Sequence, residues 1–250
     1  MTSRERVNKA LNHEETDYEP LDVGGMLATG MAASSVYKLR VALGLRKGGD
    51  PVKVIEPYQM LGEIDEDLRK ALGIDCIPLM SPKNIFGFEN KDWKSWKLFD
   101  GTPVLVPEAF NTEPDKNGDI LRYPQGNKSV PPCARMPKGG FYFDAITRQE
   151  PIEEDKLKVE DHLEEYKSIS EEELRYYEEQ ADYLYRNTEY AIVGSFGGTS
   201  FGDIALVPGI SLKHPKGIRD IEEWYISLVT RADFIYEIFD RQCEIALSNL

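Results

Sequence analysis

The sequence predicts an α/β protein: the first part of a parallel (β/α)8 barrel of the TIM type, containing about three of the core strands and a β-rich insertion at 85–149. Three observations support this prediction. Short apolar runs end in small residues, amphipathic helices alternate with these runs, and the insertion is rich in aromatic residues and turn dipeptides. We expect residues 1–250 to form one partial barrel domain that carries the insertion.

The predicted core strands are the apolar runs 18–25, 74–80 and 190–199. The first and third runs end in glycines and the second ends at Ser81, which is typical of strands that end in loops. A closed barrel of this kind has eight strands, so the count is about five short. We therefore expect an incomplete barrel.

Helices are predicted between these strands from apolar residues at helical spacing. Thr2 and Glu5 have the spacing of a capping box, and Gly44 and Gly73 are placed as helix stops. The acidic segment 150–173 is interpreted as solvated surface leading into a further helix. The predicted helices cover 3–12, 34–43, 57–72, a segment carrying Leu174 to Leu184, 220–230 and 233–248.

Composition excludes several classes of function. The formal charge of −14 and the absence of a basic stretch with interleaved aromatics argue against a nucleic-acid partner. No apolar stretch is long enough for a membrane span or a signal peptide, so we expect a soluble, cytoplasmic protein. The few cysteines and histidines are scattered, and no metal site is predicted from this chain alone: Cys76, Cys133, Cys243, His13, His162 and His214.

Candidate site residues follow the predicted strands, because active sites of parallel α/β proteins gather at the carboxyl ends of the strands. No catalytic residue can be assigned. Asp22 has two interpretations that stay open: a carboxylate facing a ligand, or a carboxylate that caps its own loop. The glycines after the third strand lack the spacing of a dinucleotide or phosphate loop. The candidate substrate-binding residues are Asp22, Gly25, Ser81, Ser195, Phe196, Gly197, Gly198 and Thr199.

The order of several short motifs resembles the start of uroporphyrinogen decarboxylase-like proteins, especially the branch that contains corrinoid-dependent methyltransferases. The resemblance covers nearly the whole chain and is looser in the insertion. The N-terminal motifs are Arg4-Glu5-Arg6-Val7, Ala10 to Glu15, Asp17, Pro20 and Asp22-Val23-Gly24-Gly25. The later ones are Gly73-Ile74-Asp75, Ile192-Val193-Gly194, Gly198 and the closing segment Phe234 to Leu247.

The resemblance implies a (β/α)8 barrel whose cleft holds either a porphyrinogen or a methyl donor presented to a corrinoid protein. Decarboxylases of the family carry an arginine-rich motif after the first strand, whereas this chain has no arginine between Arg6 and Arg40. Their second strand ends in Ser-Asp, but Ser81-Pro82 stands here, and Ala205 aligns with their pocket tyrosine. Without the guanidinium groups a polycarboxylate lacks its bidentate partners, so porphyrinogen decarboxylation is disfavoured.

We therefore expect the N-terminal part of a corrinoid-dependent methyltransferase that acts on a small methylated or methoxylated substrate. The resemblance implies zinc and a corrinoid protein as partners of the full-length enzyme, with the zinc ligands beyond residue 250. One alternative is a uroporphyrinogen decarboxylase with a rearranged pocket. Another is an inactive or split-chain fragment, which would self-associate or be completed by a partner that supplies the missing C-terminal half.

Overall fold

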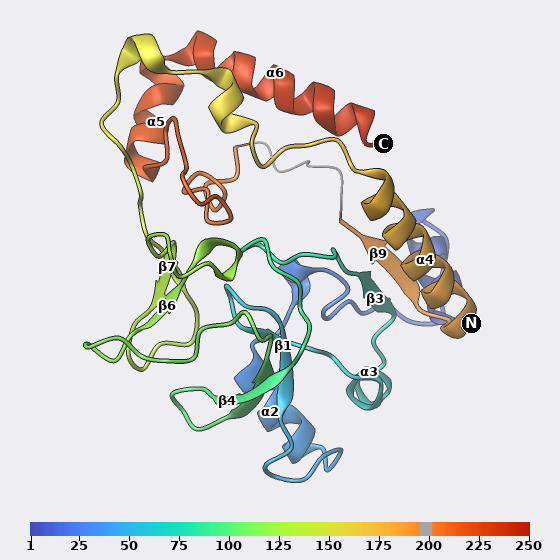
Figure 1. Cartoon of the computed structure of the whole chain (residues 1–250). Helices are drawn as coiled ribbons and strands as arrows, with labels where there is room; N and C mark the ends of the chain where they lie inside the picture. Colours follow the sequence, from blue (N-terminus) through green and yellow to red (C-terminus); the bar gives the residue numbers. More distant parts are fainter. Residues whose placement is uncertain (196–201) are drawn as a thin grey trace. The chain divides into compact units, whose positions relative to one another are not determined.

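The computed structural model describes residues 1–195 and 202–250 (Figure 1). The chain divides into two compact units. Unit 1 consists of Met1–Pro82, Asn90–Glu108 and Glu171–Ser195. Unit 2 consists of Lys83–Glu89, Ala109–Ser170 and Phe196–Leu250, of which the last segment is described from residue 202. Each unit is described by itself.

Unit 1 contains four α-helices and a short 3-10 turn. Thr2 caps the first helix through the predicted capping box with Glu5, and this prediction is confirmed. Gly73 ends the third helix in the left-handed conformation at φ 68°, as its placement after the apolar face predicts. The helices are α1 (Ser3–Leu11), α2 (Ala33–Ala42), α3 (Glu66–Leu72) and α4 (Glu171–Asn187), and the turn is η1 (Leu27–Thr29).

A mixed four-stranded sheet in unit 1 has the order β2-β1-β5-β4. The β1–β5 pair is parallel and the other two pairs are antiparallel. Val52, Val54, Val104 and Val106 alternate along the two central strands and are buried. The strands are β1 (Val52–Glu56), β2 (Leu61–Gly62), β4 (Lys94–Lys97) and β5 (Pro103–Val106).

The second sheet of unit 1 is a parallel pair, β3 (Cys76–Leu79) and β9 (Ala191–Gly194). Cys76 pairs with Ala191 at one end, and Leu79 pairs with Gly194 at the other. Helices α1 and α4 pack against β9, and α4 also contacts β3 (Figure 1). The predicted strands at 74–80 and 190–199 are therefore neighbours in one sheet.

Unit 2 contains an antiparallel sheet in the order β6-β7-β8 and two long helices. Its apolar core joins the helices to the segment before α4, and includes Trp224, Ile235 and Ile238. The elements are β6 (Ile120–Arg122), η2 (Pro124–Gly126), β7 (Ala134–Met136), β8 (Asp144–Ala145), η3 (Glu154–Lys156), η4 (Val159–His162), α5 (Ile221–Thr230) and α6 (Ala232–Ser248).

Two predicted elements are wrong in detail. Residues 18–25 form no strand, because the Asp22 carboxylate accepts the Gly25 N–H and turns the chain. Residues 57–65 are not helical: Glu56 accepts the N–H groups of the turn that follows β1, and the chain returns as β2. The helix begins only after Asp65, whose carboxylate caps it.

The described residues form three open sheets and no closed barrel. The prediction of an α/β protein with parallel strand pairs is confirmed. Five strands, β4 to β8, lie within 85–149, but the β4–β5 hairpin belongs to unit 1 and pairs with β1, whereas β6 to β8 belong to unit 2. Gly101 and Gly118 have φ of 83° and 87°, the left-handed conformation that their turns require.

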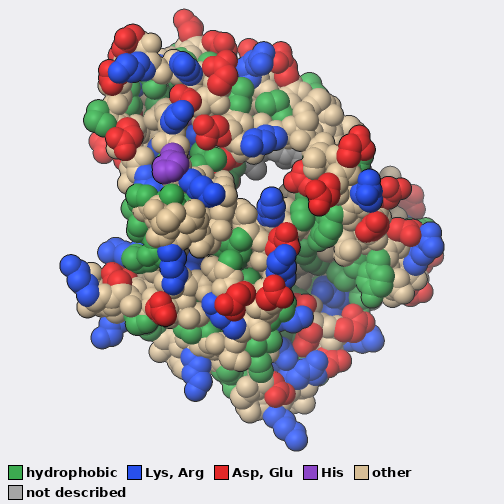
Figure 2. Space-filling model, in the orientation of Figure 1, with side chains coloured by type: hydrophobic (Ala, Val, Ile, Leu, Met, Phe, Trp, Pro, Cys, Tyr) green, Lys and Arg blue, Asp and Glu red, His purple; other side chains and the backbone are tan. Residues whose placement is uncertain are grey.

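No helix within residues 1–195 and 202–250 combines the length and the apolar character that a membrane span needs. Acidic and basic side chains are interspersed over the face in Figure 2.

Candidate functional site

Ser81 and Ser195 leave the same edge of the β3–β9 pair. Because Leu79 lies opposite Gly194 in a parallel register, Ser81 and Ser195 lie just beyond the same end of the pair. Both serines are exposed. Phe196, Gly197, Gly198 and Thr199, which continue from Ser195, lie outside the described residues. The carboxyl edge predicted to bear the site therefore exists, with two of its candidate residues in place.

Asp22 and Gly25 lie at the opposite end of β3. Asp22 Oδ1 accepts the Gly25 N–H at 2.7 Å, and its Oδ2 accepts the Thr29 hydroxyl at 2.9 Å. Of the two interpretations of Asp22, the loop-capping one describes these contacts. A Cβ atom on Gly25 would lie 2.6 Å from Cys76 Cβ, so this glycine is pressed against the first residue of β3. The structure does not bring Asp22 to Ser81 and Ser195.

A buried ion pair anchors this loop. Asp75 accepts a hydrogen bond from Arg6 on one carboxylate oxygen and the Leu21 N–H at 3.0 Å on the other. The Arg6 and Asp75 side chains are 4% and 1% exposed. The Asp75 N–H donates to the Leu21 carbonyl, and the Asp75 carbonyl accepts the Ala191 N–H. Asp75 thus ties α1, residue 21 and β9 to the start of β3.

Cys76 is a buried thiol and shows no sign of a nucleophile. Burial, and secondarily the carboxylates of Asp22 and Asp75, raise the pKa of Cys76 to about 11. The thiol is protonated near neutral pH. Cys76 serves as a small apolar side chain at the start of β3.

The arginines around the β3–β9 pair donate to protein groups. Arg69 donates to the carbonyls of Cys76 and Ile64, both at 2.7 Å, and its burial lowers its pKa. Arg4 donates to the Thr188 carbonyl at 2.8 Å. Arg6 donates to the carboxylates of Asp17 and Asp75, so these three arginines direct their donors to groups of the protein itself.

A pocket of unit 1 lies away from that edge. Its volume is about 740 Å³, and it is lined by Tyr190, which immediately precedes β9, and by Glu66, Lys70 and Arg186 among others. The charged side chains are paired: Lys70 with Glu66 and Arg186 with Asp182. Tyr190 donates its hydroxyl to Glu66 at 3.1 Å. None of the predicted site residues lines this pocket.

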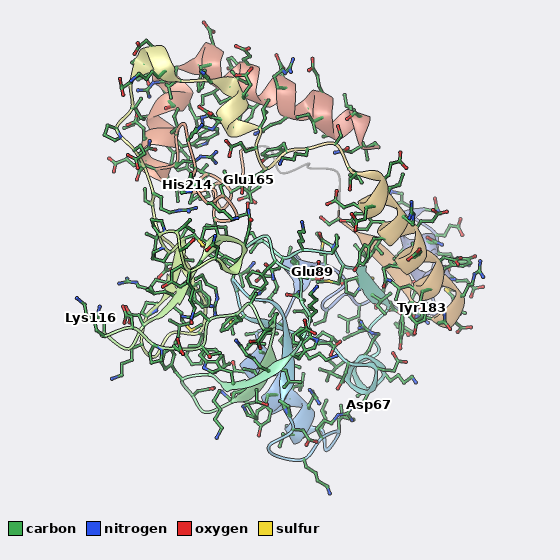
Figure 3. The ribbon with its side chains drawn as sticks, viewed as in Figure 1. Asp67, Glu89, Lys116, Glu165, Tyr183 and His214 are labelled. Carbon is green, nitrogen blue, oxygen red and sulfur yellow. The ribbon has the colours of Figure 1, made fainter. Side chains whose placement is uncertain are left out.

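Unit 2 contains a polar cluster that sequence reasoning missed. The Glu165 cluster consists of His162, Glu165, Tyr166, Ser211 and Arg219, and Glu165 is labelled in Figure 3. Glu165 accepts the Ser211 hydroxyl at 2.7 Å and an Arg219 N–H at 3.4 Å. Its side chain is 17% exposed, whereas most acidic side chains of 150–173, such as Glu150 and Glu160, are exposed as the sequence predicts. The partners lie more than 40 positions apart, so no local spacing indicates the cluster.

Burial controls the protonation of this cluster. It lowers the pKa of His162 to about 3, so the ring is neutral and its Nε2 accepts the Ile218 N–H at 3.2 Å. It raises the pKa of Glu165 despite the contacts with Ser211 and Arg219. It also raises the pKa of Tyr166 to about 12, with a smaller contribution from the Glu165 charge.

A zinc site does not fit the residues that the structure describes. No group of three or more His, Cys, Asp or Glu side chains within 1–195 and 202–250 is arranged to hold a metal ion. The described residues therefore supply no zinc ligand set, and no chemical step is assigned to zinc in this chain.

Comparison of the chain with protein-family models, with curated proteins and with solved structures found no match.

Proposed function

We propose that this chain is the N-terminal part of a corrinoid-dependent methyltransferase of the uroporphyrinogen decarboxylase superfamily. The reaction moves a methyl group from a small methylated or methoxylated compound to a corrinoid and leaves the demethylated compound as the second product. The observation that carries the proposal is the order of the resembling motifs, which run from Arg4 to Leu247 along the chain.

The parallel β3–β9 pair supports an active site of the parallel α/β type. Loops that leave the carboxyl ends of neighbouring parallel strands converge on one opening, and Ser81 and Ser195 begin two such loops. Both hydroxyls are exposed and can donate or accept a hydrogen bond. We assign them to the substrate side of the site, together with Phe196, Gly197, Gly198 and Thr199.

The arginine contacts favour a small substrate over a porphyrinogen with many carboxylates. Arg4 and Arg69 donate hydrogen bonds to backbone carbonyls. Arg6 donates to the carboxylates of Asp17 and Asp75. Recognition of a polycarboxylate needs guanidinium groups with free bidentate donors. A decarboxylase with a rearranged pocket is therefore the weaker reading. An inactive or split-chain fragment predicts no methyl transfer without a partner chain.

The corrinoid and the zinc belong to the proposal for the longer protein. A zinc ion there supplies Lewis-acid polarisation of the methyl donor. Within this chain, Asp22 holds its own loop, and its proposed contribution to substrate binding is indirect, through the position of Gly25 beside β3.

The test is a panel of methylated and methoxylated small molecules, each incubated with chemically reduced cobalamin and the full-length protein of which this chain is proposed to be the N-terminal part. Methylcobalamin is detected by its absorption spectrum. We expect its formation to need both the protein and one class of donor. Boiled protein and donor-free reactions are the controls. Methyl transfer that appears only after adding a separately expressed partner chain supports the split-chain alternative instead.

A further inference from the structure

A small pocket within unit 2 is built from the Glu165 cluster and its neighbours. Its volume is about 30 Å³, which is enough to admit a water molecule. Glu165, Asp203, Tyr166, Trp224, Gln242 and Arg219 contribute to its lining. All lining residues belong to the described part of unit 2. The pocket can hold a single small polar group.

Gln242 is a buried polar side chain of this lining, and only one of the two polar atoms of its carboxamide has a hydrogen-bond partner. The residue is 4% exposed, and its Nε2 donates to the His162 carbonyl at 3.3 Å. Its Oε1 is buried and has no hydrogen-bond partner among the described residues. The terminal torsion of glutamine is soft, so a modest rotation can turn this oxygen toward a guest. A guest that donates hydrogen bonds would remove the cost of the unpaired acceptor.

The charges of the lining favour a cationic guest. Glu165 and Asp203 are carboxylates, whereas Arg219 is the one guanidinium. Arg219 directs its donors to the carbonyls of Lys216 and Asp161, both at 2.6 Å, and to Glu165. Arg148 also acts electrostatically on Glu165, but it does not line the pocket and donates to the carbonyls of Gly209 and Leu212.

The aromatic side chains point to the same class of guest. Trp224 and Tyr166 both line the pocket, and the faces of aromatic rings attract ammonium groups. Two carboxylates, a carboxamide oxygen and two aromatic rings around a volume of this size match a compact cation that can donate several hydrogen bonds. A quaternary ammonium lacks these hydrogen-bond donors.

We infer that this pocket of unit 2 binds a primary ammonium group, either the ammonium ion or the amino end of a small alkylamine. This site is distinct from the proposed methyl-transfer site at the carboxyl edge of β3 and β9. The inference does not depend on the proposed methyl transfer.

The probe is ammonium chloride, with methylammonium chloride as the smallest alkylamine. The whole chain is titrated while its melting temperature is followed, and sodium chloride keeps the ionic strength constant. We expect a saturable rise with ammonium and methylammonium, and none with tetramethylammonium. The affinity is then measured by isothermal titration calorimetry.

Gln242→Met removes the carboxamide with little change in volume, and we expect it to weaken ammonium binding about tenfold or more, as expected for loss of one hydrogen bond to a charged group. Gln180→Met, the same change on α4 of unit 1, is the matched control and should leave the affinity unchanged. Because Gln242 is buried, Asp203→Asn provides a second test at an exposed position, with an expected loss of several-fold.

Equal responses to ammonium and sodium would overturn the inference, as would undiminished binding by folded Gln242→Met. If Gln242→Met does not fold, unchanged affinity in Asp203→Asn overturns it. A pocket that holds water alone gives no ammonium-specific saturation.

Discussion

Single residues at both candidate regions are held by close contacts that permit little variation. Gly25 has Asp22 Oδ1 and Cys76 Cβ within 2.4 and 2.6 Å of where a Cβ would stand. His162 is packed between Trp224 and Phe234, with ring centroids 5.8 and 5.7 Å away. In each case the local arrangement depends on the chemistry of one position.

Gly25→Ala should destabilise the protein by about 2 kcal/mol, because the added methyl group overpacks the contact between the loop and β3. Gly48→Ala is the matched control. Neither glycine has a positive φ, but the nearest atom to a Cβ on Gly48 is the Tyr37 hydroxyl oxygen at 3.9 Å. Urea unfolding of both variants measures the difference. Equal stabilities would show that the loop does not press on Cys76.

His162 should make the protein less stable in mild acid. The folded-state pKa is about 3, against 6.5 for the free side chain, so the unfolded chain binds the extra proton as the pH falls through this window. The contribution of His162 to the free energy of unfolding is therefore complete above about pH 6.5 and decreases as the pH falls below it. Between about pH 7.5 and about pH 5, this decrease amounts to about 2 kcal/mol.

The measurement is urea unfolding of the wild type and His162→Gln at these two pH values. The variant is expected to be less stable near neutrality, but it should lack this part of the pH dependence because glutamine does not titrate. A variant with the same slope as the wild type would contradict the assignment of a neutral buried imidazole.

Sequence patterns predicted the helix caps correctly but not the surroundings of the buried or partly buried carboxylates. Thr2 with Glu5, and Gly73 after an apolar face, were predictable because caps depend on spacing within one turn of chain. The role of Asp22 remained open because either interpretation suits a carboxylate after an apolar run. The acidic segment 150–173 is mostly exposed as predicted, but the partial burial of Glu165 was not predictable because it depends on Ser211 and Arg219, which are remote in sequence.

At the scale of elements, the β3–β9 pair is the part of unit 1 against which α1 and α4 pack. Its two strands were predicted because continuous apolar runs bounded by small residues are typical of parallel strands. The missing first strand and the shortened third helix have a common cause. Carboxylates at Asp22, Glu56 and Asp65 accept backbone N–H groups and impose turns that apolar periodicity does not register.

The attachment of α1 to this pair should depend on Asp75. Asp75→Asn removes the buried charge that faces Arg6 while keeping an oxygen for the Leu21 N–H, and leaves the buried guanidinium with the more exposed Asp17 as its carboxylate partner. We expect a loss of about 3 kcal/mol in the free energy of unfolding.

Lys38→Met is the control for the loss of an ion pair, since Lys38 is 66% exposed beside Asp100 and its pairing should contribute less than about 1 kcal/mol. Chemical denaturation compares the two variants. If Asp75→Asn costs no more than Lys38→Met, the ion pair does not anchor the start of β3.

At the scale of the whole molecule, the sequence predicted the α/β class and the presence of parallel pairs, but not the division into two units. The β4–β5 hairpin looks local in sequence, yet it pairs with β1, more than 40 positions earlier. Long-range pairing of this kind is set by packing and cannot be read from turn dipeptides. The carboxyl-edge residues Ser81 and Ser195 were predicted because topology alone places them together.

The methyl-transfer proposal unites the motif order, the carboxyl edge of β3 and β9, and the engaged arginines. Its direct test is the fate of a labelled methyl group. The full-length protein is incubated with reduced cobalamin and with a donor from the panel that carries a deuterated methyl group, and a parallel sample receives uroporphyrinogen. The account predicts labelled methylcobalamin and unchanged uroporphyrinogen. Unlabelled cobalamin together with decarboxylation of uroporphyrinogen would contradict it.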